Sequence, residues 1–159
     1  MTADPPGEDL FCACVMRSTQ LVDLEYQENA GISEETVKDQ VYRQLTRDGY
    51  SAKKNSPHGK GPDIEGWSAQ QGDMVVEAKG EGSRPEMFHN FFLAAIGQIV
   101  LRMSKTNARY VVALPIHENF VKLVRKVPQD VRRKLNLEFW LVGSKPVSYS
   151  IHILRPDAD

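Results

Sequence analysis

The strongest constraint in this sequence is a pair of extended segments, residues 63–67 and 73–80, which the polar stretch SAQQG joins. The first segment reads DIEGW and the second DMVVEAKG, a pattern typical of a β-hairpin. A hairpin that turns symmetrically about Gln70 places Asp63 opposite Glu77, because each lies seven residues from the turn. The sequence therefore predicts that two carboxylates from neighbouring strands come to one place.

Charged residues interrupt the otherwise apolar second strand. Side chains alternate between the two faces of a strand, so Glu77 and Lys79 share one face with Val75. Charge buried in a strand costs roughly several kcal/mol unless it is paired or bound to a metal. Two opposed carboxylates, about 5 Å apart at Cβ, repel each other. A divalent cation relieves that repulsion most simply, and oxygen ligands favour Mg²⁺.

A helix is predicted ahead of the hairpin. Ser33 suits the N-cap position, and Gly49 suits the position just past the helix end. Val37, Val41 and Leu45 recur with helical spacing and define the inward face.

The other segments complete an α/β pattern. Early strands joined by hairpins, with later strands joined through helices, indicate a mixed β-sheet flanked by helices. Pro128 either breaks the third helical segment or starts a further helix. The remaining predicted elements are a strand at 49–55, helix at 86–104, strand at 108–115, helix at 118–135, and strands at 137–143 and 149–154.

Length and charge indicate one domain with a separate N-terminal extension. The 159 residues, 41% hydrophobic and 26% charged, suit a single soluble domain at 32–159. Residues 1–31 are expected to be an extension, partly disordered, in which 10–31 is compatible with a helix or a strand. Residues 1–40 hold 9 acidic and 2 basic side chains (−7), whereas 41–159 hold 12 and 18 (+6). With no membrane span or signal peptide expected, we predict a cytoplasmic protein.

The hairpin resembles the signature of a known nuclease superfamily. Pro-Asp at 62–63, thirteen further residues and Glu-Ala-Lys at 77–79 are similar to the motif of the PD-(D/E)xK nucleases. This superfamily includes type II restriction enzymes and Holliday-junction resolvases. The resemblance covers roughly residues 33–115. It implies a restriction-endonuclease-like fold with an αβββαβ core.

The resemblance also implies roles for the motif residues. Asp63 and Glu77 would hold Mg²⁺, with the Ala78 backbone carbonyl as a third ligand and Mn²⁺ as a substitute ion. Lys79 would lie beside the attacking water. Such an ion offsets phosphate charge and activates water.

Two helices are expected to contribute further site residues. Glu34 lies on the inward face three residues before Val37, so we assign it as the superfamily's helix acid and keep Glu35 in reserve. The alternative is an ordinary first-turn acid. Gln98 matches a glutamine that some branches carry near the active centre, although Arg102 stands where those branches have tyrosine. Gln98 would hydrogen-bond and Arg102 would meet phosphate, unless Gln98 is simply a core amide.

Basic residues outside the motif are candidates for contact with nucleic acid. His58 and Lys60 precede Asp63 in a Gly/Pro loop. Lys122, Arg125 and Lys126 form part of a basic run, which is either a solvated helix face or a contact with the DNA backbone.

The sequence therefore predicts a Mg²⁺-dependent DNA endonuclease that acts in restriction or in repair and recombination. The partner would be duplex or branched DNA, and we expect a homodimer because such folds often address two strands with two sites. The alternative is a non-catalytic module that binds nucleic acid or protein and retains the nuclease fold.

Overall fold

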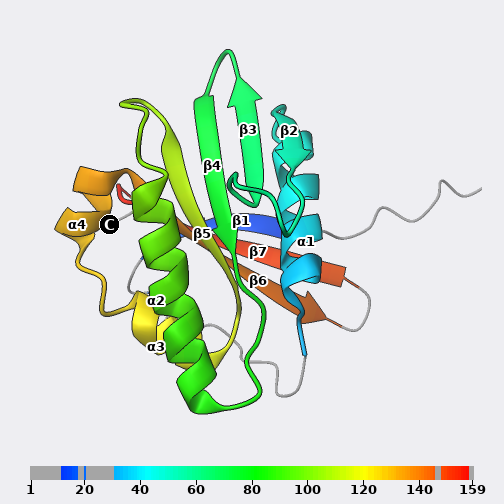
Figure 1. Ribbon diagram of the computed structural model, residues 1–159, viewed down its shortest axis with the longest axis vertical. Coiled ribbons are helices and arrows are strands. Elements are labelled where there is room, and N and C mark those ends of the chain that lie inside the picture. Colours follow the sequence, from blue (N-terminus) through cyan, green and yellow to red (C-terminus); the bar gives the residue numbers. More distant parts are fainter. Residues whose placement is uncertain (1–11, 18–19, 21–30, 146–147, 158–159) are drawn as a thin grey trace, which may run out of the picture.

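A seven-stranded mixed β-sheet with helices on both faces makes up the part of the chain that the computed structural model describes, residues 12–17, 20, 31–145 and 148–157 (Figure 1). The predicted α/β class with a mixed, helix-flanked sheet is confirmed. In chain order the elements are β1 (Cys12–Met16), α1 (Glu34–Arg47), β2 (Ser51–Lys54), β3 (Ile64–Ser68), β4 (Gly72–Ala78), α2 (Pro85–Leu101), β5 (Arg109–Pro115), α3 (Glu118–Val124), α4 (Gln129–Leu135), β6 (Leu137–Lys145) and β7 (Ser148–Leu154).

The sheet has the order β1-β7-β6-β5-β4-β3-β2. Strands β4, β5 and β6 run parallel to one another, while β2, β3 and β4 are antiparallel neighbours. At the other side, β7 pairs antiparallel with β6 and parallel with β1. Parallel strands end at a common edge, so the carboxyl ends of β4 and β5 lie side by side.

The β3–β4 hairpin has the predicted register. Ile64 pairs with Val76 and Ser68 pairs with Gly72, so the hairpin turns about Gln70. The predicted alternation of faces along β4 is also confirmed. Val75 belongs to the core under α2 and α3, whereas Met74, Val76 and Ala78 belong to the core under α1.

Helix α1 forms for the predicted reasons. The Ser33 side chain accepts a hydrogen bond from the Thr36 backbone N–H, which satisfies one of the free amides at the helix start. The apolar face of α1 packs against the sheet through three buried side chains, Val37, Val41 and Leu45. Past the C-cap, Gly49 adopts a φ of 86°, a left-handed conformation that suits glycine.

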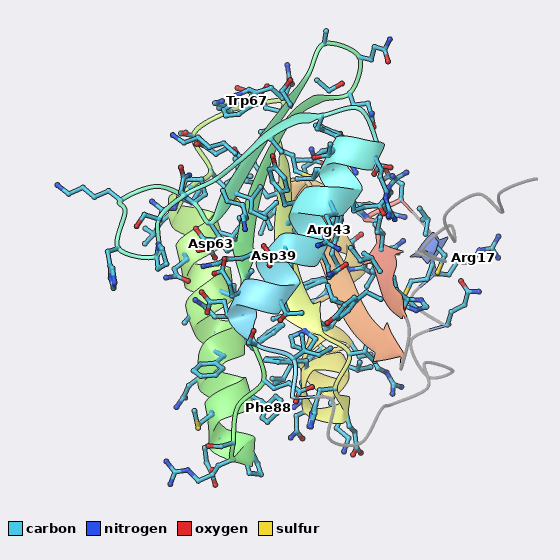
Figure 2. The ribbon with its side chains drawn as sticks, turned by 90° about the vertical axis from the view of Figure 1, so that its right-hand side faces the viewer. Arg17, Asp39, Arg43, Asp63, Trp67 and Phe88 are labelled. Atoms are coloured by element: carbon cyan, nitrogen blue, oxygen red, sulfur yellow. The ribbon has the colours of Figure 1, made fainter. Side chains whose placement is uncertain are left out.

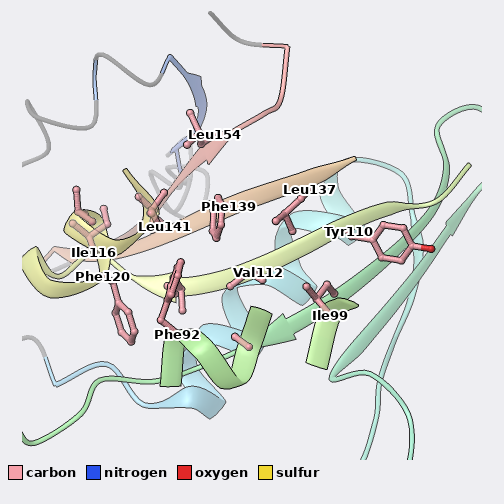
Figure 3. Packing of buried hydrophobic residues seen from close by; sticks show 14 of the residues in the cluster. Phe92, Ile99, Tyr110, Val112, Ile116, Phe120, Leu137, Phe139, Leu141 and Leu154 are labelled. Atoms are coloured by element: carbon pink, nitrogen blue, oxygen red, sulfur yellow. The ribbon is translucent and has the colours of Figure 1, made fainter. Parts of the chain in front are cut away.

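Helix α2 covers the opposite face but is less buried than its apolar sequence indicates. Phe92 stacks on Phe139 with ring centroids 6.0 Å apart, and Ile99 packs in the same core (Figure 3). On the outer side Leu93 is 54% exposed and Leu101 is 86% exposed. That side is exposed because a helix on the surface of a sheet buries only one stripe of side chains. The helix also ends at Leu101 rather than at residue 104.

Two further segments settle open alternatives. Pro128 is the N-cap of α4, so it separates two short helices. Within 10–31, Cys12–Met16 is a strand of the sheet. Residues 1–11, 18–19 and 21–30 lie outside the described residues, and so does most of the N-terminal extension that the sequence predicts to be partly disordered. Among the described helices, none combines the length and apolarity needed to cross a membrane.

Gly80 brings the end of β4 against the start of α1. A Cβ at this position would lie 2.4 Å from the Glu34 backbone N and 2.9 Å from the Ser33 carbonyl carbon. Next to it, the Glu81 N–H donates to the Ile32 carbonyl at 2.9 Å. The glycine that follows the Glu-Ala-Lys triplet thus lets the first turn of α1 approach the carboxylates of the hairpin.

Substituting this glycine should loosen that junction. We expect Gly80→Ala to lower the free energy of unfolding by about 1–3 kcal/mol, because the added methyl overlaps backbone atoms that cannot move independently. Gly97→Ala is the matched control in α2, where a Cβ meets no atom within 4 Å. It should raise stability by about 0.5–1 kcal/mol through helix propensity. Denaturant unfolding measures both, and equal effects would contradict the close approach at Gly80.

Candidate active site

Asp63 and Glu77 come together at the end of the β3–β4 hairpin. Continuing the pairing of Ile64 with Val76 by one residue sets Asp63 beside Glu77. The Asp63 carboxylate also accepts a hydrogen bond from the Ala78 backbone N–H, with Oδ2 2.8 Å from that nitrogen. In Figure 2 Asp63 lies between α1 and α2. The structure therefore brings together the two carboxylates that the sequence pairs.

Glu77 is the buried member of this pair. Its side chain is 3% exposed, whereas that of Asp63 is 17% exposed. The pKa of Glu77 is raised from 4.5 to about 7: burial is the largest cause, the negative charge of Asp63 and a hydrogen bond with it add to the rise, and Arg102 opposes it. Two carboxyl groups that share one site resist being ionised together. The site thus favours a cation or a proton between them.

Arg102 forms an ion pair with Glu77. It is the C-cap of α2, and its Nε donates to Glu77 Oε1 at 3.1 Å. Its other two nitrogens donate to the backbone carbonyls of Lys60 and Gly61, at 2.9 and 3.0 Å. We predict from the sequence that Arg102 meets phosphate, but here its guanidinium contacts the Glu77 carboxylate and the loop carbonyls of Lys60 and Gly61.

Lys38 is a site residue that the sequence analysis missed. Its ammonium lies 2.9 Å from Glu34 Oε1 and 3.1 Å from Asp63 Oδ1, and the residue is 3% exposed. Burial lowers the pKa of Lys38, but the hydrogen bonds that its ammonium donates to Glu34 and Asp63, together with their negative charges, outweigh burial and raise the pKa overall. The signal available in the sequence was the i, i+4 spacing of Glu34 and Lys38 on the helix.

The two candidate helix acids point to different partners. Glu34 connects to Asp63 through Lys38, and its side chain is 41% exposed. Glu35 instead pairs with Lys54 of β2 at 3.6 Å and is 61% exposed. Of the two, Glu34 is the one linked to the carboxylate pair.

Lys79 follows Glu77 by two residues and lies just past β4. Its backbone N–H donates to the Ala113 carbonyl at 3.0 Å, so the chain is still held in the β4–β5 ladder at this point. The residue is half-buried. Among the described residues, no carboxylate pairs with its ammonium. A charged amine without an internal counter-ion is suited to an anionic ligand.

The donor set fits a magnesium ion. Among the described residues, no group of three or more His, Cys, Asp or Glu side chains could hold a metal. A Mg²⁺ ion at this site would therefore have two side-chain ligands, Asp63 and Glu77. The Ala78 carbonyl points toward β3 like its N–H, and the position opposite is Pro62, which has no N–H to donate. That carbonyl is therefore available as a third oxygen. One or two carboxylates with water is the usual protein contribution to a Mg²⁺ site.

Three other predicted residues are exposed, one on α2 and two in the loop before β3. Gln98 is exposed on α2, one turn before Arg102, so the alternative of a core amide is wrong. His58 and Lys60 are exposed in the loop between β2 and β3, and the Lys60 carbonyl is one of the groups that Arg102 holds.

The basic residues of the third helical segment stand apart from the carboxylates. Lys122 pairs with Glu118 one turn earlier on α3, and both side chains are exposed. Arg125 and Lys126 follow the helix and are also exposed. Among the described residues, no hydrogen bond or ion pair joins these three basic side chains to Asp63 or Glu77.

Comparison with known proteins finds structural similarities at low identity. No family model matches the chain, and no curated protein matches it. A protein of unknown function from Silicibacter pomeroyi is 15% identical over 80% of this chain and 71% of that chain, with a TM-score of 0.46. An XisH family protein from Nostoc punctiforme PCC 73102 is 18% identical over 71% and 95%, with a TM-score of 0.46. An fdxN element excision controlling factor protein from Anabaena variabilis is 17% identical over 71% and 95%, also at 0.46.

The raised pKa of Glu77 predicts how metal-free stability varies with pH. From its ordinary value of 4.5 up to about 7, the folded protein holds a proton that the unfolded chain has lost. The free energy of unfolding should therefore fall across this window, by on the order of 1–3 kcal/mol, and level off above it. Urea unfolding in EDTA measures the slope. Glu77→Gln should remove most of the fall, and an unchanged slope in that variant would assign it to other groups.

Removing the Lys38 ammonium should destabilise the site. We expect Lys38→Met to lower the free energy of unfolding by about 2 kcal/mol, because Asp63 loses its cation while remaining mostly buried. Lys53→Met is a control on β2, where the side chain is exposed. It should change stability by less than about 0.5 kcal/mol. Equal effects of the two substitutions would show that Lys38 contributes nothing through Asp63.

Proposed function

We propose that this protein is a Mg²⁺-dependent endonuclease that hydrolyses phosphodiester bonds in DNA. The observation that carries the proposal is the convergence of Asp63 and Glu77 at the Ala78 backbone, whose N–H donates to Asp63, with Lys79 next along the chain. This combination of oxygen ligands and a lysine matches the motif of the PD-(D/E)xK nucleases residue by residue.

Each residue has a role that follows from its chemistry. Asp63, Glu77 and the Ala78 carbonyl would hold Mg²⁺, which when bound offsets phosphate charge and lowers the pKa of a water ligand. Lys79 would donate hydrogen bonds to a phosphate oxygen and stabilise the negative charge that develops there. Lys38 pairs with the Asp63 carboxylate and fixes its direction from α1.

The surroundings supply contacts for a polyanionic substrate. His58 and Lys60 are exposed in the loop beside the carboxylates, and Gln98 is exposed on the neighbouring helix. The Lys60 ammonium would bind the phosphate backbone regardless of base sequence, and the imidazole and amide N–H groups could donate hydrogen bonds to phosphate oxygens. The exposed Lys122 of α3 would act at a distance from the reacting phosphate.

A second candidate is a non-catalytic binding module with the same fold. The observation that favours it is that Lys38 and Arg102 already pair with Asp63 and Glu77. Such a network balances the charges of the two carboxylates without any metal. The two candidates differ in whether Mg²⁺ binds and whether DNA is cut.

Metal binding and cleavage can be tested on the same variants. At a Mg²⁺ concentration about 100 times Kd, the free energy of unfolding of the wild type should rise by about 2.7 kcal/mol. Asp63→Asn should abolish this increase together with cleavage of plasmid, linear, branched and single-stranded DNA. Lys79→Ala should keep the stabilisation and lose at least about 100-fold in cleavage rate.

Asp73→Asn is the matched control for the hairpin, because Asp73 lies at the opposite end of β4 and pairs with Lys105. It should leave both metal stabilisation and cleavage unchanged. Stabilisation by Mg²⁺ without cleavage of any substrate would favour the binding module. Cleavage by Lys79→Ala at the wild-type rate would contradict the proposed site.

A further inference from the structure

One guanidinium group joins the carboxylate pair to the loop that precedes it. Arg102 donates from Nε to Glu77, from Nη1 to the Lys60 carbonyl and from Nη2 to the Gly61 carbonyl. These three contacts use all three nitrogens of a side chain that is 31% exposed. Arg102 therefore links Glu77 to the loop at residues 60–61. If the guanidinium moves away from Glu77, its hydrogen bonds to the loop are weakened as well.

The 55–63 loop is also anchored at its base. The Asn55 N–H donates to the Asp63 carbonyl at 2.9 Å, and the Asn55 side chain donates to the Pro62 carbonyl at 2.7 Å. Residues 56–61 between these ends are exposed. Among the described residues, the Arg102 contacts are the hydrogen bonds that tie the tip of this loop to α2.

Arg102 and a divalent cation would compete for the same carboxylate. The guanidinium lies on Glu77 Oε1, and the half of the site contributed by Asp63 is already bound to Lys38. A divalent ion between the two carboxylates would repel the guanidinium at close range and take over its role of neutralising Glu77. Only its hydrogen bonds to the Lys60 and Gly61 carbonyls would then keep the Arg102 guanidinium in place, against repulsion by the divalent ion.

We propose that Arg102 is a metal-sensitive latch: it occupies Glu77 in the metal-free protein and leaves when a divalent cation binds, which releases the 55–63 loop. This inference rests on the proposed function and adds its regulation. The loop carries His58 and Lys60, so its release would let these side chains reach the substrate only after the metal site is loaded. Arg102 acts here as a positioning residue through Glu77 and the loop.

Limited trypsin digestion reads the latch directly, without DNA and without activity. Trypsin cuts after lysine, and the Lys60–Gly61 bond contains the carbonyl that Arg102 Nη1 holds. Cleavage of a native protein follows the population of the open form when opening is fast. Saturating Mg²⁺ should increase cleavage at Lys60–Gly61, identified by mass spectrometry, about tenfold in the wild type. Asp63→Asn should show no such increase.

Two substitutions at Arg102 separate its charge from its hydrogen bonds. Arg102→Gln removes both, so the loop should be cut fast without Mg²⁺ and Mg²⁺ should bind about tenfold more tightly. Arg102→Lys keeps a cation beside Glu77 but cannot donate to both loop carbonyls from a planar group. It should be cut fast while its Mg²⁺ affinity stays near that of the wild type. Arg84→Gln, at the exposed other end of α2, is the control and should behave as the wild type.

The outcomes distinguish this inference from the proposed function. Stabilisation of the wild type by Mg²⁺ with unchanged or slower cleavage at Lys60–Gly61 would overturn the latch and leave the metal site intact. Wild-type cleavage rates in both Arg102 variants without Mg²⁺ would overturn it as well. Failure of Mg²⁺ to stabilise either the wild type or Arg102→Gln would overturn the proposed function, and the latch with it.

Discussion

The apposition of Asp63 and Glu77 is the constraint on which the rest of the site depends. Two carboxylates beside one another, one of them 3% exposed, are tolerated only if positive charge or a proton lies close by. In the described part of the chain, Lys38 supplies that charge from α1 and Arg102 supplies it from the end of α2. The two helices on opposite sides of the hairpin are thus coupled through the carboxylates between them.

A small number of backbone features position the side chains of the candidate site. The symmetric hairpin sets Asp63 beside Glu77, and the parallel pairing of β4 with β5 holds the chain at Lys79. Gly80 admits the first turn of α1, which carries Glu34 and leads to Lys38 one turn later. The candidate site lies at the ends of strands that the core fixes in place, and these strands anchor Asp63, Glu77 and Lys79.

Local patterns predicted the hairpin register, the alternation along β4 and helix α1, because each depends on residues close in sequence. The partners of the carboxylates could not be predicted in the same way. Lys38 faces Asp63 only once α1 packs beside the hairpin, and Arg102 reaches Glu77 only because α2 ends there. The pairing of Cys12–Met16 with β7 likewise joins segments from opposite ends of the chain. Long-range geometry of this kind leaves no periodic signal in the sequence.

Diffraction from crystals grown with Mn²⁺ tests the central claim most directly, because the anomalous signal locates the ion without reference to activity. We expect one ion bound by the Asp63 and Glu77 carboxylates and the Ala78 carbonyl, with the Arg102 guanidinium withdrawn from Glu77. An ion bound elsewhere, or none while Arg102 remains on Glu77, would contradict this expectation.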